Sequence, residues 1–428
     1  MLVGTDIFGE MALLSPEDSL EELARLAETA GLKVVGAALQ RLDKPNTASY
    51  IGSGKVEEVK AMVIELEATV IVFDDELQPR QQRSLEKEFE EDEIKVLDRT
   101  ALILDIFAQH AQTREGKLQV ELAQLEYRIP RLTRMWTHLA RQAGTGGGGG
   151  GSVGLRGPGE TQLEMDRRMI NKRLAHIKSE LDAVMAHRSR HRSKRQQTAL
   201  QTIAIVGYTN AGKSTLLNRL SKASVLSADM LFATLDPTTR RVRMPGGRDV
   251  LFTDTVGFIQ KLPTGIVAAF RATLEEIVEA DILLHVVDAT HPNVGAQIES
   301  VLDTLAELEV DHYPMVYAFN KVDAMPEGVS LDDLPEVDSW KVHVSAQTGE
   351  GIKELREAVF EAVKSTYASI EIKLPYDRGD LVSLFHERGI VDIEAYEDTH
   401  VAMSGRIPPR LLSYFNKFTL DGEYWEEI

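Results

Sequence analysis

The feature that most constrains this chain is an apolar segment that leads directly into a glycine-rich loop. Residues 202–207 read Thr-Ile-Ala-Ile-Val-Gly, which is typical of a buried strand. The loop satisfies the pattern G-x-x-x-x-G-K-[ST], which binds phosphate where it joins a strand to a helix. The expected nucleotide contacts are Gly207, Tyr208, Thr209, Asn210, Ala211, Gly212, Lys213, Ser214 and Thr215. The sequence therefore predicts a nucleotide-binding α/β fold.

Each kind of residue in this loop has a physical role in holding phosphate. The glycines let the backbone wrap, so that successive N–H groups and the helix N-terminus point at the β-phosphate. The ammonium of Lys213 reaches the β and γ oxygens, and the hydroxyl of Ser214 is a ligand for Mg²⁺. We therefore expect a nucleotide bound with Mg²⁺, and we count Lys213 among the catalytic residues.

A second segment, residues 249–257, predicts a further contact with the phosphates. It reads as a strand that ends in Asp254, Thr255, Val256 and Gly257, all expected at the nucleotide. The carboxylate of Asp254 can hold Mg²⁺ through water, and the amide of Gly257 can meet the γ-phosphate. Gly257 is therefore the second expected catalytic residue.

Between these two motifs lies a candidate switch segment. Its expected nucleotide contacts are Phe232, Ala233, Thr234, Leu235 and Asp236. We choose Thr234 as the second Mg²⁺ ligand and as the third catalytic residue. Thr238 and Thr239 remain alternatives, because the sequence does not fix which hydroxyl turns inward.

Two later strand ends predict which base is bound. They supply Asn320, Lys321 and Asp323 after the apolar run 315–319, and Ser345 and Ala346 after the run 342–344. The carboxylate of Asp323 can accept two parallel hydrogen bonds from guanine, whereas adenine lacks that pair of donors. The amide of Ala346 can face the guanine oxygen. We therefore expect GTP and GDP as the ligands.

The residue after Gly257 is Phe258, where many GTPases have a glutamine that positions the attacking water. A phenyl ring cannot orient water, so we expect slow intrinsic hydrolysis and completion of the site by a partner. The alternative is that another residue of this chain positions the water.

The length of 428 residues predicts two to four domains. The alternation of strands and helices from residue 201 to about residue 368 predicts a doubly wound parallel sheet. The expected domains are a small α/β domain (1–112), a basic helical hairpin with a glycine-rich tip (113–196), the GTPase domain (197–367) and a small α+β domain (368–428).

The hairpin is predicted from the spacing of apolar residues. Residues 118–139 follow the four-three alternation of a coiled coil, and a similar seam runs through residues 163–184. Pro130 lies inside the first seam, so we expect a kink or break near Ile129. Two such helices joined by a loop should form an antiparallel hairpin, whose tip at residues 144–160 contains six consecutive glycines.

The charge of the chain is unevenly distributed. The formal net charge of −19 argues against a nucleic-acid partner, but residues 128–195 contain fifteen Lys or Arg and only five acids. Arginines beside a bare glycine backbone can contact phosphate or stack on unpaired bases of RNA. The candidates are Arg141, Arg156, Arg167 and Arg168. The alternative for the glycine tract is a flexible linker.

The cellular location follows from two absences in the sequence. There is no cysteine, which excludes disulfides and agrees with a reducing cytoplasm. The longest apolar stretch is far shorter than the roughly 20 residues of a membrane span. We therefore expect a cytoplasmic protein without a membrane span, and we expect a monomer.

Over nearly its whole length the chain resembles the HflX family, within the translation-factor-like GTPases. The most specific pieces are 154–164 with 166–168, the phosphate loop with Asn210, residues 232–236 and residues 254–258. The resemblance implies that the N-terminal domain and hairpin bind the large ribosomal subunit, with the glycine tip reaching rRNA near the peptidyl transferase centre. It also implies ribosome-stimulated GTP hydrolysis and the splitting or rescue of stalled ribosomes, notably under heat stress.

The same resemblance bears on the metal site. It implies that Ser214 and Thr234 are the Mg²⁺ ligands and that Phe258 belongs to a hydrophobic-substituted class of GTPases. Asn210 is similar to the asparagine that binds K⁺ in potassium-dependent GTPases, so K⁺ is a candidate second cation. A runner-up hypothesis is a regulatory GTP-binding switch that acts on a protein partner, with RNA only as a tether.

Overall fold

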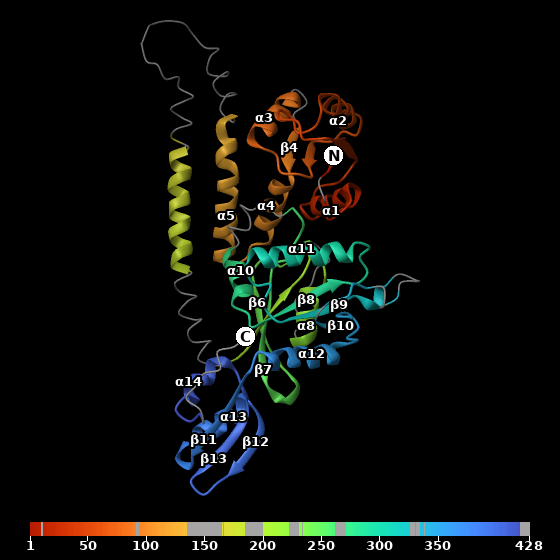
Figure 1. Ribbon diagram of the computed structural model, residues 1–428. Helices are drawn as coiled ribbons and strands as arrows, with labels where there is room; N and C mark the ends of the chain where they lie inside the picture. Colours follow the sequence, from red (N-terminus) through yellow and green to blue (C-terminus); the bar gives the residue numbers. More distant parts are fainter. Residues whose placement is uncertain are drawn as a thin grey trace. The chain divides into compact units, whose positions relative to one another are not determined.

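The computed structural model describes residues 1–9, 12–90, 94–134, 165, 167–184, 200–221, 231–232, 234–261, 271–325, 330, 334–337 and 339–419. The chain forms two compact units (Figure 1). The first contains residues 1–186, 228–236 and 259–273, and the second contains residues 187–227, 237–258 and 274–428. The candidate switch segment therefore belongs to the same unit as the N-terminal domain. The four domain boundaries stay a prediction.

The first unit contains a four-stranded parallel sheet in the order β2-β1-β3-β4. Short apolar runs form its strands because a parallel sheet buries side chains on both faces, and three of the four residues of Val70–Phe73 are buried. The elements are β1 (Leu2–Ile7), α1 (Pro16–Thr29), β2 (Ala37–Leu42), α2 (Ser53–Glu65), β3 (Val70–Phe73), α3 (Pro79–Glu88), β4 (Lys95–Asp98) and α4 (Arg99–His110). The expected small α/β domain is confirmed.

A helical hairpin extends from this domain. Its first helix, α5 (Arg114–Arg128), lies beside the helix formed by residues 167–184 (Figure 1). Leu118, Leu122 and Ile177 are buried between them. The ion pair Arg114–Glu180 at 2.5 Å joins the start of α5 to the end of the other helix, and Arg173–Glu121 at 2.6 Å joins residues nearer their middles. The antiparallel arrangement is therefore confirmed.

The first helix of the hairpin ends where Pro130 predicts a break. α5 stops at Arg128, and a 3₁₀ helix, η2 (Ile129–Arg134), follows. This end is fixed to the N-terminal domain, because Tyr127 donates a hydrogen bond to Asp98 at 2.8 Å and Arg131 donates to the Leu77 carbonyl at 2.6 Å. Among the described residues, no helix combines the length and apolar character needed to cross a bilayer.

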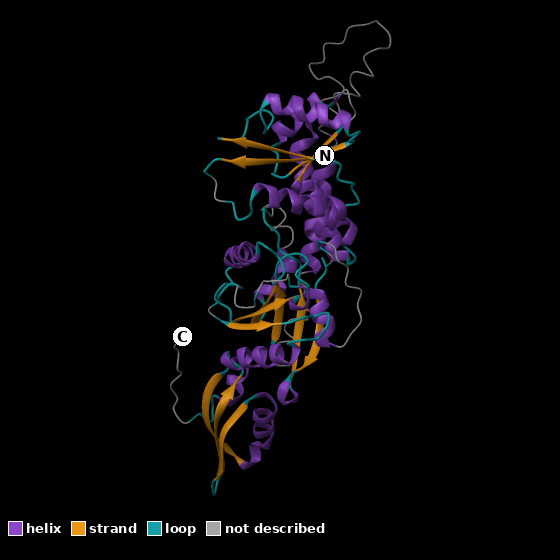
Figure 2. Ribbon diagram, turned by 90° about the vertical axis from the view of Figure 1, so that its right-hand side faces the viewer, coloured by secondary structure: helices purple, strands orange, loops and turns teal. Residues whose placement is uncertain are grey.

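The second unit contains a six-stranded sheet in the order β10-β9-β8-β5-β7-β6. Its strands are β5 (Thr202–Val206), β6 (Thr238–Arg243), β7 (Asp249–Asp254), β8 (Ile282–Asp288), β9 (Met315–Asn320) and β10 (Trp340–His343). The helices are α8 (Lys213–Ser221), α10 (Arg271–Val278), whose first three residues belong to the first unit, α11 (Val294–Glu307) and α12 (Ile352–Ser365). Figure 2 shows the strands in orange and the helices in purple. The doubly wound architecture is confirmed.

One strand departs from the predicted all-parallel sheet. β6 pairs with β7 in the antiparallel direction, whereas the other four pairings are parallel. A connection of only five residues, 244–248, joins the two strands. Such a connection is too short for the crossover that parallel strands require, so β6 must return as a hairpin at the edge of the sheet.

The C-terminal part of the second unit is a separate antiparallel sheet in the order β11-β13-β12. Its elements are β11 (Ala368–Pro375), α13 (Gly379–Arg388), β12 (Ile390–Tyr396), β13 (His400–Ile407) and α14 (Leu412–Phe415). Alternate residues of β13 are buried, as expected for a sheet with one face against a core. The expected small α+β domain is confirmed.

Candidate nucleotide site

The phosphate loop lies between β5 and α8, and two of its glycines are required by both conformation and space. Gly207 has φ 148° and Gly212 has φ 94°, which favour glycine. A Cβ on Gly207 would lie 2.2 Å from the Val286 carbonyl oxygen, and one on Gly212 would lie 2.3 Å from Asn320 Nδ2. The loop therefore closes tightly against the neighbouring strand ends.

Lys213 is buried at the first turn of α8 and is folded onto the loop. Its ammonium donates hydrogen bonds to the carbonyls of Gly207 at 3.0 Å and Tyr208 at 2.8 Å. Burial lowers the pKa of this ammonium to about 8, although the charge of Asp254 acts in the opposite direction. The lysine is therefore held as a cation whose charge is incompletely compensated by protein groups.

We expect this environment to make nucleotide affinity depend on pH. Bound phosphates should raise the pKa of Lys213 above about 8, so binding takes up a proton. The contribution of the Lys213 charge to binding is complete below the pKa that this lysine has in the free protein. It is lost as pH rises through that pKa, and the affinity then falls by at most about tenfold per pH unit. We expect the affinity for GDP to fall between about pH 7 and pH 9. A Lys213→Met variant should bind more weakly with a flatter pH dependence, and equal slopes in the two proteins would contradict this explanation.

The structure brings together two of the predicted Mg²⁺ ligands. The hydroxyl of Ser214 donates a hydrogen bond to Asp254 Oδ2 at 2.6 Å. Mg²⁺ prefers oxygen ligands and commonly uses one or two protein groups together with nucleotide phosphates and water. Within the described residues, no group of three or more His, Cys, Asp or Glu could hold a metal. The hydroxyl of Ser214 and the carboxylate of Asp254 are oxygen ligands of the kind that Mg²⁺ uses.

The alternatives to Thr234 as a metal ligand lie in β6. Thr239 is within 3.0 Å of the Thr253 hydroxyl, so its hydroxyl is engaged across the sheet. Thr238 is paired with Asp254 in the register of β6 and β7. Thr234 is half-buried and belongs to the first unit. The choice among the three threonines stays a prediction.

Asn320 connects the three loops at the predicted base site. Its amide donates to the Ala211 carbonyl at 2.8 Å, and its side-chain oxygen accepts from the Ala346 amide at 2.9 Å. Arg219 of α8 supports the same region by donating to the carbonyls of Ala346, at 2.9 Å, and Gln347. Ser345 is buried, and its hydroxyl accepts from the Thr348 amide at 3.0 Å. The phosphate loop and both base motifs are thus tied together.

Lys321 and Asp323 occupy different environments. Lys321 has a left-handed backbone with φ 67°, and its ammonium lies 2.7 Å from Asp288 Oδ2. Asp323 is exposed in the 3₁₀ turn η4 (Val322–Ala324). A bound base would therefore have to cover this carboxylate. Sequence reasoning missed Asp288 and Arg219, and no local motif identifies either residue.

The segment after β7 is fixed to the phosphate loop by its backbone. The Thr209 amide donates to the Phe258 carbonyl at 2.8 Å, and the Phe258 amide donates to the Gly207 carbonyl at 3.1 Å. A Cβ on Gly257 would lie 2.9 Å from the Thr209 backbone and 3.0 Å from Lys213 Nζ. The ring of Phe258 is buried, as are Thr255 and Val256. The side chain of Phe258 is therefore part of the core.

The candidate switch segment contacts the N-terminal domain and the hairpin within the first unit. The rings of Phe232 and Phe107 are 4.7 Å apart between centroids, and Leu235 is buried. Asp236 accepts hydrogen bonds from the amides of Gln112 and Thr113, both at 2.9 Å, and from the Thr113 hydroxyl. Ala233 lies outside the described residues. The predicted contacts of this segment with nucleotide stay predictions.

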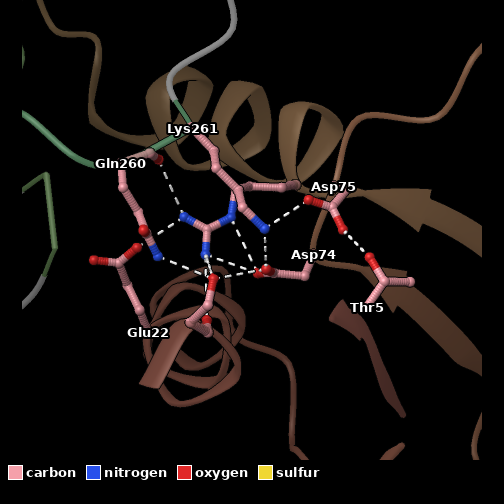
Figure 3. Close-up of polar contacts among 8 residues, drawn as sticks. Thr5, Glu22, Asp74, Asp75, Gln260 and Lys261 are labelled. Carbon is pink, nitrogen blue, oxygen red and sulfur yellow. Dashed lines mark hydrogen bonds and ion pairs between the residues drawn. The ribbon is translucent and has the colours of Figure 1, made fainter. Parts of the chain in front are cut away.

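A second connection involves Gln260 and Lys261, which follow Phe258 closely in the sequence (Figure 3). Lys261 lies 2.6 Å from both Asp74 and Asp75, which follow β3. Gln260 donates to the Ser19 hydroxyl at 2.9 Å, and its carbonyl accepts from Arg99 at 3.2 Å. Sequence reasoning did not find this cluster, because its members come from separate parts of the chain.

Arg99 is the centre of that cluster and is 1% exposed. Its guanidinium lies 2.8 Å from Asp74 and 2.8 Å from Glu22. Burial by itself would raise the pKa of Asp74, but the charges of Arg99 and Lys261 outweigh it and lower that pKa. The carboxylate of Asp74 is therefore ionised and depends on its cationic partners.

The predicted RNA contacts are only partly described. Arg167 and Arg168 are exposed on the second helix of the hairpin, which agrees with availability to a partner. Arg141, Arg156 and the glycine tip lie outside the described residues. Contact with RNA therefore stays a prediction for all four arginines.

Comparison with known proteins agrees with this arrangement of motifs. Family models match in succession: GTP-binding GTPase N-terminal over residues 17–108, GTP-binding GTPase Middle Region over 110–195, and 50S ribosome-binding GTPase over 202–321. A GTPase HflX of Magnetococcus marinus is 48% identical over 382 residues, covering 89% of this chain and 86% of that protein. Proteins of the same name from Lacrimispora saccharolytica (45% identity, 92% and 90% coverage) and Escherichia coli K12 (42% identity, 91% and 90% coverage) are also similar.

A crystal structure of a GTP-binding protein from Sulfolobus solfataricus in complex with GDP has 23% identity and a TM-score of 0.42, covering 85% of this chain and 99% of that chain. The family of this chain is assigned from its sequence relatives and not from this structural likeness. The doubly wound sheet with its phosphate loop, together with the matching family models, places the chain in the class of P-loop GTPases. Relatives at 42–48% identity span about nine-tenths of the chain, so the chain belongs to the HflX family. As a member of this family it is an enzyme that hydrolyses GTP to GDP and phosphate.

Proposed function

We propose that this GTPase binds the large ribosomal subunit through its helical hairpin and splits or rescues stalled ribosomes in the cytoplasm. Hydrolysis of GTP, stimulated by the ribosome, controls its release. The observation that carries the proposal is the concentration of basic residues in the hairpin of an otherwise acidic chain. Polyanionic RNA is the partner that such a segment fits, and the charge of the remaining chain would discourage non-specific binding.

Three features support this proposal. The family model that matches residues 202–321 is described as a 50S ribosome-binding GTPase. The exposed Arg167 and Arg168 lie on the second helix of the hairpin, which packs against α5, and the end of α5 is fixed to a folded domain. Asp236 bonds to Gln112 and Lys261 to Asp74, so the segments just before and just after residues 237–258 belong to the first unit, together with the hairpin.

We also propose roles for the residues of the nucleotide site. Mg²⁺, held by Ser214, Thr234 and, through water, Asp254, would neutralise charge that develops on the phosphates. Lys213 would bind the β and γ oxygens, and the Gly257 amide would orient the γ-phosphate. The ring of Phe258 is buried and has no polar atom that could position water, so the intrinsic reaction should be slow. Asn320, Lys321 and Asp323 would select guanine.

The proposal is tested by sedimentation with isolated large subunits in the presence of GDP or a non-hydrolysable GTP analogue. We expect association with the GTP analogue and weaker association with GDP. GTP turnover should rise when large subunits are added, because the partner completes the site. Absent or nucleotide-independent association would contradict ribosome-directed function and would favour the runner-up, a switch whose partner is a protein.

The glycine tip can be tested separately. Replacement of residues 146–151 by Ser-Ala repeats should leave GTP binding intact but reduce ribosome-stimulated turnover, because side chains would prevent close approach of the backbone to RNA. Lys353→Ala is a surface control on α12, since the side chain of Lys353 is 84% exposed and forms only a weak ion pair with Glu357 at 3.8 Å. If the ribosome still stimulates turnover of the tip variant fully, the glycine tract acts only as a linker.

A further inference from the structure

A partly buried carboxylate beside the base motif, Asp288, has no role in the site described above. Asp288 ends β8, and in the parallel register of β8 and β9 it is paired with Asn320. Its Oδ2 atom lies 2.7 Å from the Lys321 ammonium. We infer that Asp288 is a positioning residue of the guanine site, which holds Lys321 so that the methylene stem of the lysine forms one wall of the base pocket. This inference rests on the proposed role of residues 320–323.

The carboxylate of Asp288 is itself held in one orientation. Oδ1 accepts hydrogen bonds from the Thr290 amide at 3.0 Å and from the Thr290 hydroxyl at 2.6 Å. The other carboxylate oxygen, Oδ2, accepts from the Lys321 ammonium. Because the two oxygens have separate donors, rotation of the carboxylate would break contacts on both sides. Thr290, Asp288 and Lys321 therefore form a chain of fixed contacts that ends at the base motif.

The exposure of the pair indicates a geometric role. The side chains of Lys321 and Asp288 are 31% and 14% exposed, so solvent partly screens their attraction. The attraction between such partly screened charges contributes little net stability. A free lysine side chain, in contrast, loses about 1.5–2 kcal/mol of rotamer freedom when it is ordered. The larger consequence of the contact is that this ordering is complete before nucleotide binds.

The location of the pair agrees with that role. Asn320 precedes Lys321 and connects the Ala211 and Ala346 loops, which the sequence assigns to phosphate and base. The Ala289 amide donates to the Asn320 carbonyl at 2.9 Å, so the residue after Asp288 is fixed to the same strand end. The lysine stem therefore starts from a rigid backbone and ends at a rigid acceptor.

Asp288→Asn tests the inference directly. An amide offers one oxygen, so the NH₂ group must face the donors of either Thr290 or Lys321. We expect KM for GTP and Kd for GDP to rise about 13–30-fold, the range that corresponds to losing the pre-ordered side chain. The kcat at saturating GTP should stay unchanged, because the reacting phosphate is remote from Lys321. Thr290→Val should weaken binding in the same direction by a smaller factor.

Asp281→Asn is the matched control at the opposite end of the same strand. Asp281 precedes β8, accepts from the Thr202 amide at 2.7 Å and pairs with Arg410. Its replacement can lower the melting temperature but should leave KM and Kd unchanged. If both variants change stability and affinity in the same proportion, Asp288 has only a structural role.

A double-mutant cycle with Lys321→Met decides whether Asp288 acts through the lysine. In the Lys321→Met background, the Asp288→Asn change should cost less than about twofold in GDP affinity, because the group that it positions is gone. Independent, multiplying losses would overturn the inference. If Lys321→Met by itself leaves guanine affinity unchanged, the proposed base site is wrong, and that outcome is distinct from failure of the Asp288 contact.

Discussion

Replacement of Asp323 by asparagine is expected to lower the affinity for GTP by about two to three orders of magnitude and to raise the affinity for xanthosine triphosphate. In the proposed base site the carboxylate would accept from two guanine donors, whereas asparagine presents one acceptor and one donor. Its donor would face the exocyclic amine of guanine but would match the oxygen that xanthine has there. Loss of one partner of a charged hydrogen-bonded pair costs about 2–5 kcal/mol once ligand has buried it.

The exposure of Asp323 makes this prediction specific to the complex. In the free protein the carboxylate is in water, so the substitution should leave the melting temperature almost unchanged. Asp311→Asn, whose side chain is 62% exposed, makes the same chemical change outside the site and should leave both affinities unaltered. Competition binding with the two triphosphates is the measurement. Persistent preference for guanine in the Asp323 variant would show that the base lies elsewhere.

Replacement of Arg99 by methionine is expected to destabilise the N-terminal domain by about 3 kcal/mol. Removing one member of a buried ion pair costs about 3–5 kcal/mol because the other charge is left without compensation. We take the low end because Lys261 still contacts Asp74 at 2.6 Å. Hydrogen exchange of the β3 amides should then accelerate about a hundredfold wherever exchange requires opening of this domain.

A control for Arg99 is available on α1. Arg25 is 53% exposed and pairs with Glu21 one helical turn away, so Arg25→Met should change stability by less than about 0.5 kcal/mol. Both variants should be compared in the full chain, with the exchange of β8 in the second unit as an internal reference. Equal exchange of β3 in the two variants would show that the Arg99 cluster contributes little.

Much of the nucleotide site could be predicted from the sequence because its motifs are contiguous. In the phosphate loop, the fixed spacing from Gly207 to Ser214 already specifies the strand, turn and helix that place each group. The break at Pro130 and the antiparallel hairpin followed from local backbone chemistry and apolar spacing in the same way. These features depend on residues a few positions apart, which a single sequence displays directly.

Other features depend on tertiary structure because their partners are far apart in the chain. Lys321 meets Asp288 across 33 residues, and Gln260 meets Ser19 across 241. No spacing rule selects such a partner, since any acid at a strand end is an equally good candidate until the order of the strands is known. The sequence by itself thus determined which nucleotide chemistry this chain carries. Only the tertiary structure decided which side chains hold the base motif in place and which residues of the N-terminal domain contact Phe232, Gln260 and Lys261.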